Sequence, residues 1–152
     1  MFKWFRGSDH LTESGPVPAR SSNYDDAVKW YRRAADKGTS WGQFNLGVSY
    51  ARGQGVPQDF NEATGWFRRA AEQGEAMSQF SLGQMYERGL GVEVDQAEAY
   101  KWFQLAAWHG IAGAEKARED LRQGMATEQI VEGVRRAATF VPKTSSHPKM
   151  AN

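Results

Sequence analysis

Apolar and small residues recur along the chain at the spacing of amphipathic helices. Within residues 60–73 they fall at i, i+3, i+4, i+7 and i+8, which places them on one face of a helix. These positions are Ala63, Trp66, Phe67, Ala70 and Ala71. The same analysis predicts seven helices, over residues 24–37, 40–52, 60–73, 76–88, 96–109, 112–123 and 127–138.

The pattern repeats itself at an offset of 36 residues. Trp30, Trp66 and Trp102 fall at equivalent positions, as the glycines at 38, 74 and 110 do. A second block also recurs, so that Leu46-Gly47 and Tyr50 correspond to Leu82-Gly83 and Tyr86. A helix hairpin repeated at a fixed period buries its apolar face by stacking on its neighbours. We therefore predict an all-α fold, a solenoid of helix-turn-helix units, with the tryptophans packed inside.

Local signals support the helix boundaries. Asp59 and Asp95 precede helices, where a carboxylate caps the first turn and offsets the helix dipole. Gly74 follows a last turn, where a left-handed residue is needed. Gly47 and Gly83 stand inside helices at a cost of about 1 kcal/mol each, which indicates that a crossing helix needs the space.

These elements divide the chain into three parts. Residues 1–22 are expected to form an irregular N-terminal arm, residues 23–138 the repeat domain with a C-terminal capping helix, and residues 139–152 a flexible tail.

The composition restricts the function. The net charge is +1 with both signs interspersed, so no nucleic-acid partner is expected, and the absence of cysteine excludes disulfides and thiolate chemistry. No apolar run approaches the roughly 20 residues that span a bilayer, and the first residues lack the apolar stretch of a signal peptide. From these features we expect a cytoplasmic protein with no stable membrane anchor.

Candidate chemistry is sparse. His109 has no carboxylate or histidine at metal-ligand spacing, and the glycine loops at 53–55 and 89–91 end helices rather than follow strands. We expect no cofactor, no metal and no enzyme activity. A hidden catalytic cluster would have to use Glu87, Arg88 and Asp120.

The recurring motif resembles a known family. Leu-Gly-x-x-Tyr-x-x-Gly-x-Gly-Val, an Asp, and then Ala-x-x-Trp-x-x-x-Ala-Ala-x-x-Gly are similar to the Sel-1-like repeat of the tetratricopeptide superfamily. The resemblance implies a right-handed superhelix of bacterial type, with full repeats at 38–73 and 74–109 and a terminal half-repeat at 110–138. Residues 24–37 resemble the second helix of a repeat whose first helix is missing or degenerate.

The resemblance also implies a function. Such repeats act as scaffolds that hold a protein or peptide on a concave groove lined by the first helix of each hairpin. Alignment on the tetratricopeptide pattern predicts the partner-binding residues, although burial of Phe44 and Phe80 in the core is an equal alternative. They are Trp41, Phe44, Val48, Arg52, Met77, Phe80, Gln84, Glu87, Arg88, Lys116 and Asp120. Two other functions remain: a homodimer formed through the uncapped helix 24–37, or a small-molecule binder or enzyme.

Overall fold

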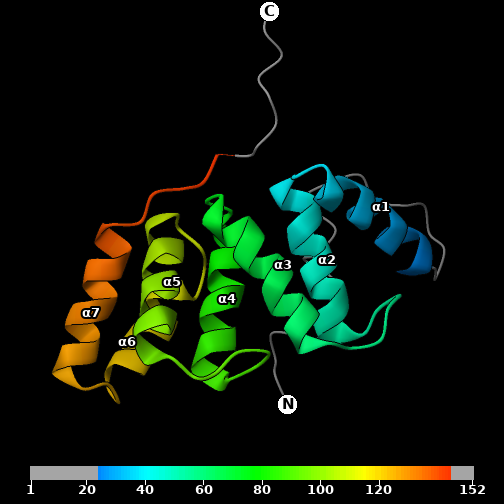
Figure 1. Cartoon of the computed structure of the whole chain (residues 1–152). Coiled ribbons are helices and arrows are strands. Elements are labelled where there is room, and N and C mark those ends of the chain that lie inside the picture. Colours follow the sequence, from blue (N-terminus) through cyan, green and yellow to red (C-terminus); the bar gives the residue numbers. More distant parts are fainter. Residues whose placement is uncertain (1–23, 145–152) are drawn as a thin grey trace, which may run out of the picture.

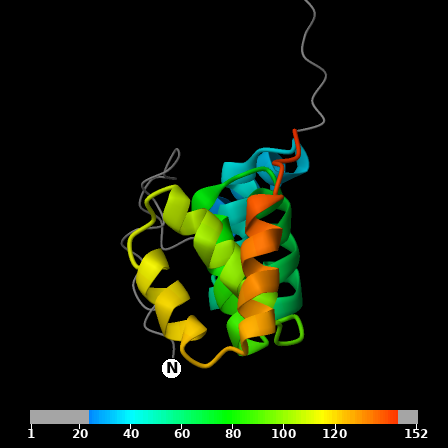
Figure 2. The ribbon, with the colours of Figure 1, turned by 90° about the vertical axis from the view of Figure 1, so that its left-hand side faces the viewer.

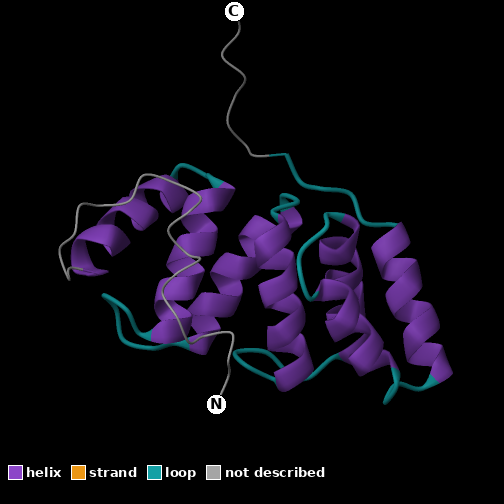
Figure 3. Ribbon diagram, turned by 180° about the vertical axis from the view of Figure 1, so that it is seen from behind, coloured by secondary structure: helices purple, strands orange, loops and turns teal. Residues whose placement is uncertain are grey.

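The protein folds as a row of antiparallel helices, and the computed structural model describes residues 24–144 (Figure 1). Figure 3, seen from behind, shows helices joined by loops throughout this part. The helices are α1 (Tyr24–Asp36), α2 (Ser40–Arg52), α3 (Phe60–Glu72), α4 (Ala76–Arg88), α5 (Gln96–Trp108), α6 (Ala114–Arg122) and α7 (Thr127–Ala138). All seven predicted helices are confirmed within two residues at each end. The irregular arm predicted over residues 1–22 lies outside the described residues.

The helices pack as consecutive hairpins. α2 pairs with α3 and α4 with α5, while α1 packs on α2 and α3 on α4. α5 then contacts both α6 and α7, so the last two helices flank it. The row has α1 at one end and α7 at the other (Figure 1). No helix within residues 24–144 is long and apolar enough to cross a membrane.

The predicted caps are present. Asp59 and Asp95 precede α3 and α5, and their side chains accept hydrogen bonds from the backbone N–H groups of Glu62 and Glu98, at 3.1 and 3.0 Å. Gly74, after α3, has a φ of 93°, the left-handed conformation expected there. These caps fix where each second helix of a hairpin begins and ends.

The core runs along the interface of each hairpin. Phe67, Phe103, Leu46, Leu82 and Met85 are its largest fully buried side chains. Because α2–α3 and α4–α5 are equivalent in sequence, the buried phenylalanines are equivalent too. The repeat therefore specifies the same packing twice.

The three repeated tryptophans do not share one environment. Trp102 is 3% exposed, Trp66 is half-buried, and Trp30 is 54% exposed. The prediction that all three pack inside is therefore wrong for Trp30. Trp30 lies on α1, at the end of the described row, whereas Trp102 lies on α5 and is covered by the segment that follows α7.

That segment runs back along the row instead of leaving it at residue 139. Phe140 packs edge-on against Trp102, with ring centroids 5.5 Å apart. Lys143 donates its backbone N–H to the Glu72 carbonyl at 2.7 Å, and its Nζ lies 2.8 Å from the Glu72 carboxylate. Residues 139–143, which we call the C-terminal strap, thus join α7 to the end of α3. Residues 145–152 of the predicted tail lie outside the described residues.

Candidate functional site

The predicted groove was to be lined by α2, α4 and α6, but α2 offers no open face. Its residues 42–49 are all buried, which leaves only the ends of the helix in contact with solvent. A helix covered on every side cannot present a binding surface. Because of this burial, the groove residues predicted within residues 42–49 are not accessible to a partner in this structure.

Phe44, Val48 and Phe80 are buried core residues, which is the alternative left open for Phe44 and Phe80. Their role in partner binding stays a prediction that burial makes less favourable. Phe44 packs on Phe67 of α3, with ring centroids 5.9 Å apart. Phe80 packs in the same way on Phe103 of α5, at 5.7 Å. In each hairpin the two rings fill the space between the helices, which is why they recur at the repeat period.

Trp41 and Met77 are half-buried. The Trp41 ring lies edge-on to Tyr31 of α1, with centroids 5.7 Å apart, and Met77 packs against the core cluster around Phe44. Both side chains therefore help to join neighbouring helices. Arg52 is also half-buried at the end of α2, and burial is the main cause that lowers its pKa.

The remaining predicted residues lie on accessible parts of α4 and α6. Gln84 and Glu87 are half-buried, whereas Arg88, Lys116 and Asp120 are exposed. The five residues are hereafter the α4–α6 charged face: Gln84, Glu87, Arg88, Lys116 and Asp120. This is the part of the predicted site that solvent, and so a partner, can reach.

Charged groups of α4 and α6 influence one another on this face. Burial chiefly raises the pKa of the Glu87 carboxyl, Arg88 lowers it, and the nearby Asp120 raises it further. Asp120 itself is paired with Lys116 on the same helix, at 2.7 Å. Both partners of that pair are largely exposed, so it contributes little to stability and is easily exchanged. The charge of Asp120 thus acts on the Glu87 carboxyl, which is itself partly withdrawn from water.

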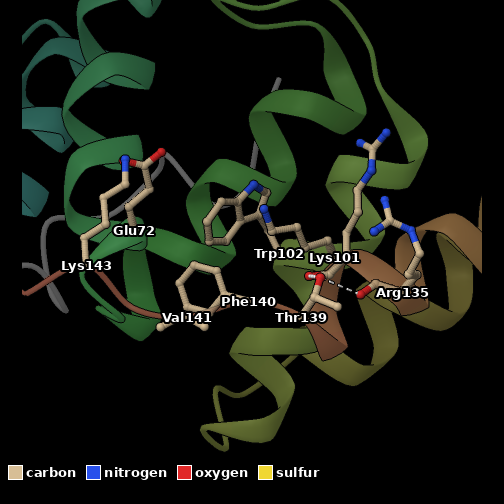
Figure 4. Close-up of a pocket in the computed structure, with 9 residues that line it drawn as sticks. Glu72, Lys101, Trp102, Arg135, Thr139, Phe140, Val141 and Lys143 are labelled. Carbon is tan, nitrogen blue, oxygen red and sulfur yellow. Dashed lines mark hydrogen bonds and ion pairs between the residues drawn. The ribbon is translucent and has the colours of Figure 1, made fainter.

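Sequence reasoning missed a cleft of about 340 Å³ beneath the C-terminal strap (Figure 4). Trp102 and Phe140 form its aromatic part, and four cationic side chains surround them. The lining residues are Glu72, Lys101, Trp102, Arg135, Arg136, Thr139, Phe140, Val141 and Lys143. Phe140, two residues after the last predicted helix, is the apolar residue that packs here, but no spacing in the sequence relates it to Trp102.

Each cation of this cleft already has an anion within the fold. Arg135 and Arg136 both bind the Glu132 carboxylate, at 2.6 and 2.8 Å. Arg136 also reaches Glu98, at 2.9 Å, and Lys101 lies 3.7 Å from the same carboxylate. Lys143 is paired with Glu72 at 2.8 Å. An ionic ligand would have to break these pairs. We therefore interpret the cleft as the packing junction of the C-terminal strap with α5 and α7, and not as a ligand site.

Metal binding finds no support in the described part of the chain. Within residues 24–144, no group of three or more histidine, aspartate or glutamate side chains is arranged to hold a metal ion. The cleft under the strap and a smaller one along α3, around Trp66, are lined by residues other than Glu87, Arg88 and Asp120. The three residues named as a hidden catalytic cluster therefore stand outside both clefts.

A row of helix hairpins whose packing recurs from one repeat to the next defines the protein as an α-solenoid of the repeat class. The chain belongs to the Sel1 repeat family, whose sequence model matches residues 10–39, 42–75 and 76–110. The first match begins at residue 10, so a repeat is recognisable where the 36-residue offset alone found no copy of the first-helix motif.

Two solved bacterial structures resemble the chain. One is a protective antigen present in uropathogenic Escherichia coli strains that displays an SLR fold; it is 32% identical, has a TM-score of 0.76, and the match covers 88% of this chain. The other is a Sel1 repeat protein from Oxalobacter formigenes, 34% identical with a TM-score of 0.64 over 72% of this chain. The matches cover only 32% and 44% of those two chains. No curated protein sequence matches the chain.

Proposed function

We propose that the chain is a protein-interaction scaffold whose partner binds the α4–α6 charged face. Repeats of the Sel1 and tetratricopeptide type generally serve as protein-interaction scaffolds and are usually non-catalytic. The observation that carries the placement is the half-buried Glu87 beside Asp120 on an accessible face. We propose no enzyme activity.

The chemistry of this face favours a basic residue in the partner. Partial burial raises the pKa of Glu87, and Asp120, which carries the same charge, raises it further, although Arg88 offsets part of this rise. A lysine or arginine placed between the two carboxylates would relieve both effects and make charge-assisted hydrogen bonds. Arg88 and Lys116 flank the same place and would accept an acidic residue next to the basic one. The partner segment is therefore a peptide in which a basic residue is followed or preceded by an acidic one.

The other predicted groove residues have a smaller part in this proposal. Trp41 and Met77 are used to join helices, and Arg52 stands at the end of α2, near Tyr24 of α1. We therefore place the interaction on the C-terminal half of the repeat domain.

Selection from a random peptide library tests the proposal without knowledge of the natural partner. Peptides are selected on the wild-type chain and then measured against Glu87→Gln/Asp120→Asn, which removes both charges and keeps the shapes. We expect the selected peptides to carry a shared lysine or arginine and to lose at least about tenfold in affinity, equivalent to ~1.4 kcal/mol. Affinity should also fall as the pH drops through the raised pKa of Glu87, because a protonated carboxyl no longer attracts the cation.

The control makes the same charge change elsewhere. Glu93 and Glu115 are exposed and lie outside the α4–α6 charged face, so Glu93→Gln/Glu115→Gln should leave the affinity unchanged. Peptides without a basic residue, or peptides that bind all three chains equally well, would overturn the placement of the site.

A further inference from the structure

The outer side of α7 carries apolar residues that no other helix covers. α7 packs onto α5 through Gly133 and Ala137; Gly133 lies so close to the Tyr100 ring that a Cβ there would be 2.9 Å from it. On the opposite side Val131 and Val134 are 62% and 47% exposed. Figure 2, which looks onto this end of the row, shows α7 with no helix in front of it.

These valines are part of a continuous stripe. Residues spaced by four, three and four positions share one side of a helix. The exposed residues at this spacing are Thr127, Val131, Val134 and Ala138. Apolar side chains that line up on the accessible side of a helix make a surface suited to association.

The charges beside the stripe indicate what covers it. Glu128 and Arg135, both exposed, lie along the same edge, seven residues and thus about two turns apart. Arg135 is held on its own helix by Glu132, while Glu128 has no ion-pair partner among residues 24–144. When two copies of α7 lie antiparallel, Glu128 of each copy is opposite Arg135 of the other, so the two edges have complementary charges. In a parallel arrangement like charges would face each other.

We propose that α7 mediates weak self-association, in which a second copy of this chain packs its own α7 antiparallel across a twofold axis between Val131 and Val134. Glu128 of each copy then faces Arg135 of the other, and the valines of the two stripes interdigitate. The two helix dipoles also oppose each other favourably. This surface is separate from the α4–α6 charged face, so the inference does not depend on the scaffold proposal.

The other end of the row is a poorer candidate for self-association. The exposed Trp30 of α1 lies in line with Asp26, Arg33 and Lys37, which are exposed as well. Burying that line would strip water from three charges around one aromatic ring, which costs free energy unless each charge is paired. The homodimer considered from the sequence is thus moved from helix 24–37 to α7.

The size of the stripe sets the strength of the association. A helix of 12 residues is about 18 Å long, so a pair of them buries far less than the ~1,200–2,000 Å² of a stable interface. The dimer should therefore dissociate at low concentration and form as the concentration rises. A single measurement at one concentration would miss it.

Sedimentation equilibrium over a wide range of protein concentrations tests the proposal on the full chain. We expect the average mass of the wild-type chain to rise with concentration from that of one chain toward that of two. Val134→Glu places a charge in the stripe and should keep the chain monomeric. The matched substitution Trp30→Glu, at an equally exposed position on α1, should leave the association intact. Circular dichroism establishes that both variants keep the helical fold.

Charge exchange tests the antiparallel arrangement. Glu128→Lys and Arg135→Glu should each weaken self-association, because each brings like charges together twice. A mixture of these two variants should associate again, because both contacts are then complementary. A wild-type chain that stays monomeric at every concentration would overturn the proposal, as would association that Trp30→Glu abolishes and Val134→Glu does not. An unchanged mass with Glu128→Lys would overturn the antiparallel arrangement.

Discussion

Gly83 of α4 lies against the ring of Phe103 of α5 so closely that a Cβ at position 83 would be 2.7 Å from the Cδ1 and Cε1 atoms of that ring. Gly47 and Phe67, one repeat earlier, have the same relationship at 2.8 Å. Both phenylalanines are fully buried. The glycine inside the first helix of each hairpin therefore exists to admit the aromatic ring of the second.

Gly83→Ala should destabilise the protein even though alanine is the better helix former. The helix gains about 1 kcal/mol from the substitution, but the methyl group overlaps a ring that is packed on all sides, and overpacking of this kind costs about 1–3 kcal/mol. We expect the free energy of unfolding to fall by about 1 kcal/mol, measured by urea denaturation.

Gly65→Ala is the matched control for that substitution. Gly65 also lies inside a helix, α3, but a Cβ there would meet no atom within 4 Å. Only the helix preference remains, so stability should rise by about 0.5–1 kcal/mol. If the two alanine variants shift stability in the same direction, the close approach of Gly83 to Phe103 is not what selects the glycine.

The repeated tryptophan should show a graded effect on stability. Trp102 is buried under the C-terminal strap, Trp66 is half-buried beneath Arg69, and Trp30 is mostly exposed. Trp102→Ala should cost about 3–5 kcal/mol, Trp30→Ala about 0.5 kcal/mol or less, and Trp66→Ala an intermediate amount. Thermal denaturation of the three variants measures the series, and an equal loss at Trp30 and Trp102 would contradict it.

Features that depend on local sequence patterns could be predicted, whereas features that depend on contacts between distant parts of the chain could not. Helix positions, the caps at Asp59 and Asp95, and the spacing of the repeat depend on local patterns, and all of them were predictable. Whether Phe44 faces a groove or a neighbouring helix depends on what covers α2 from other parts of the chain. Trp30 and Trp102 occupy one position of the motif, yet their burial differs because only Trp102 is covered by the strap.

In the candidate site, too, the positions of residues along one helix were predictable, and the contacts between helices were not. Helical spacing alone predicts that Gln84, Glu87 and Arg88 share one side of α4, whereas their role in partner binding stays a prediction. The proximity of Glu87 to Asp120 depends on how α6 leans on α5, for which the chain carries no periodic signal. The cleft under the strap was out of reach for the same reason, since Phe140 follows the last helix and meets Trp102 only through the fold.

The C-terminal strap should contribute to stability through Phe140. Its ring packs on Trp102 and lies 5.7 Å from the Lys101 ammonium, in a half-buried position. Phe140→Ala should lower the free energy of unfolding by about 2–3 kcal/mol, less than the ~3–5 kcal/mol of a fully buried phenylalanine. Val141→Ala, at a neighbouring residue that is 78% exposed, should change stability by less than about 0.5 kcal/mol. Equal effects of the two substitutions in urea denaturation would mean that the strap does not hold its place in solution.

Glu132 should make part of the stability depend on pH. Hydrogen bonds from Arg135 and Arg136 lower the pKa of its carboxyl from 4.5 to about 2. The folded state thus favours the ionised form, so the stabilisation is complete above the ordinary pKa and is lost as the pH falls from about 4.5 to about 2. The difference in melting temperature between the wild-type chain and Glu132→Gln should be present at pH 7, shrink across this window and vanish near pH 2. A difference for Glu132→Gln that stays constant down to pH 2 would mean that the two arginines do not hold this carboxylate in solution.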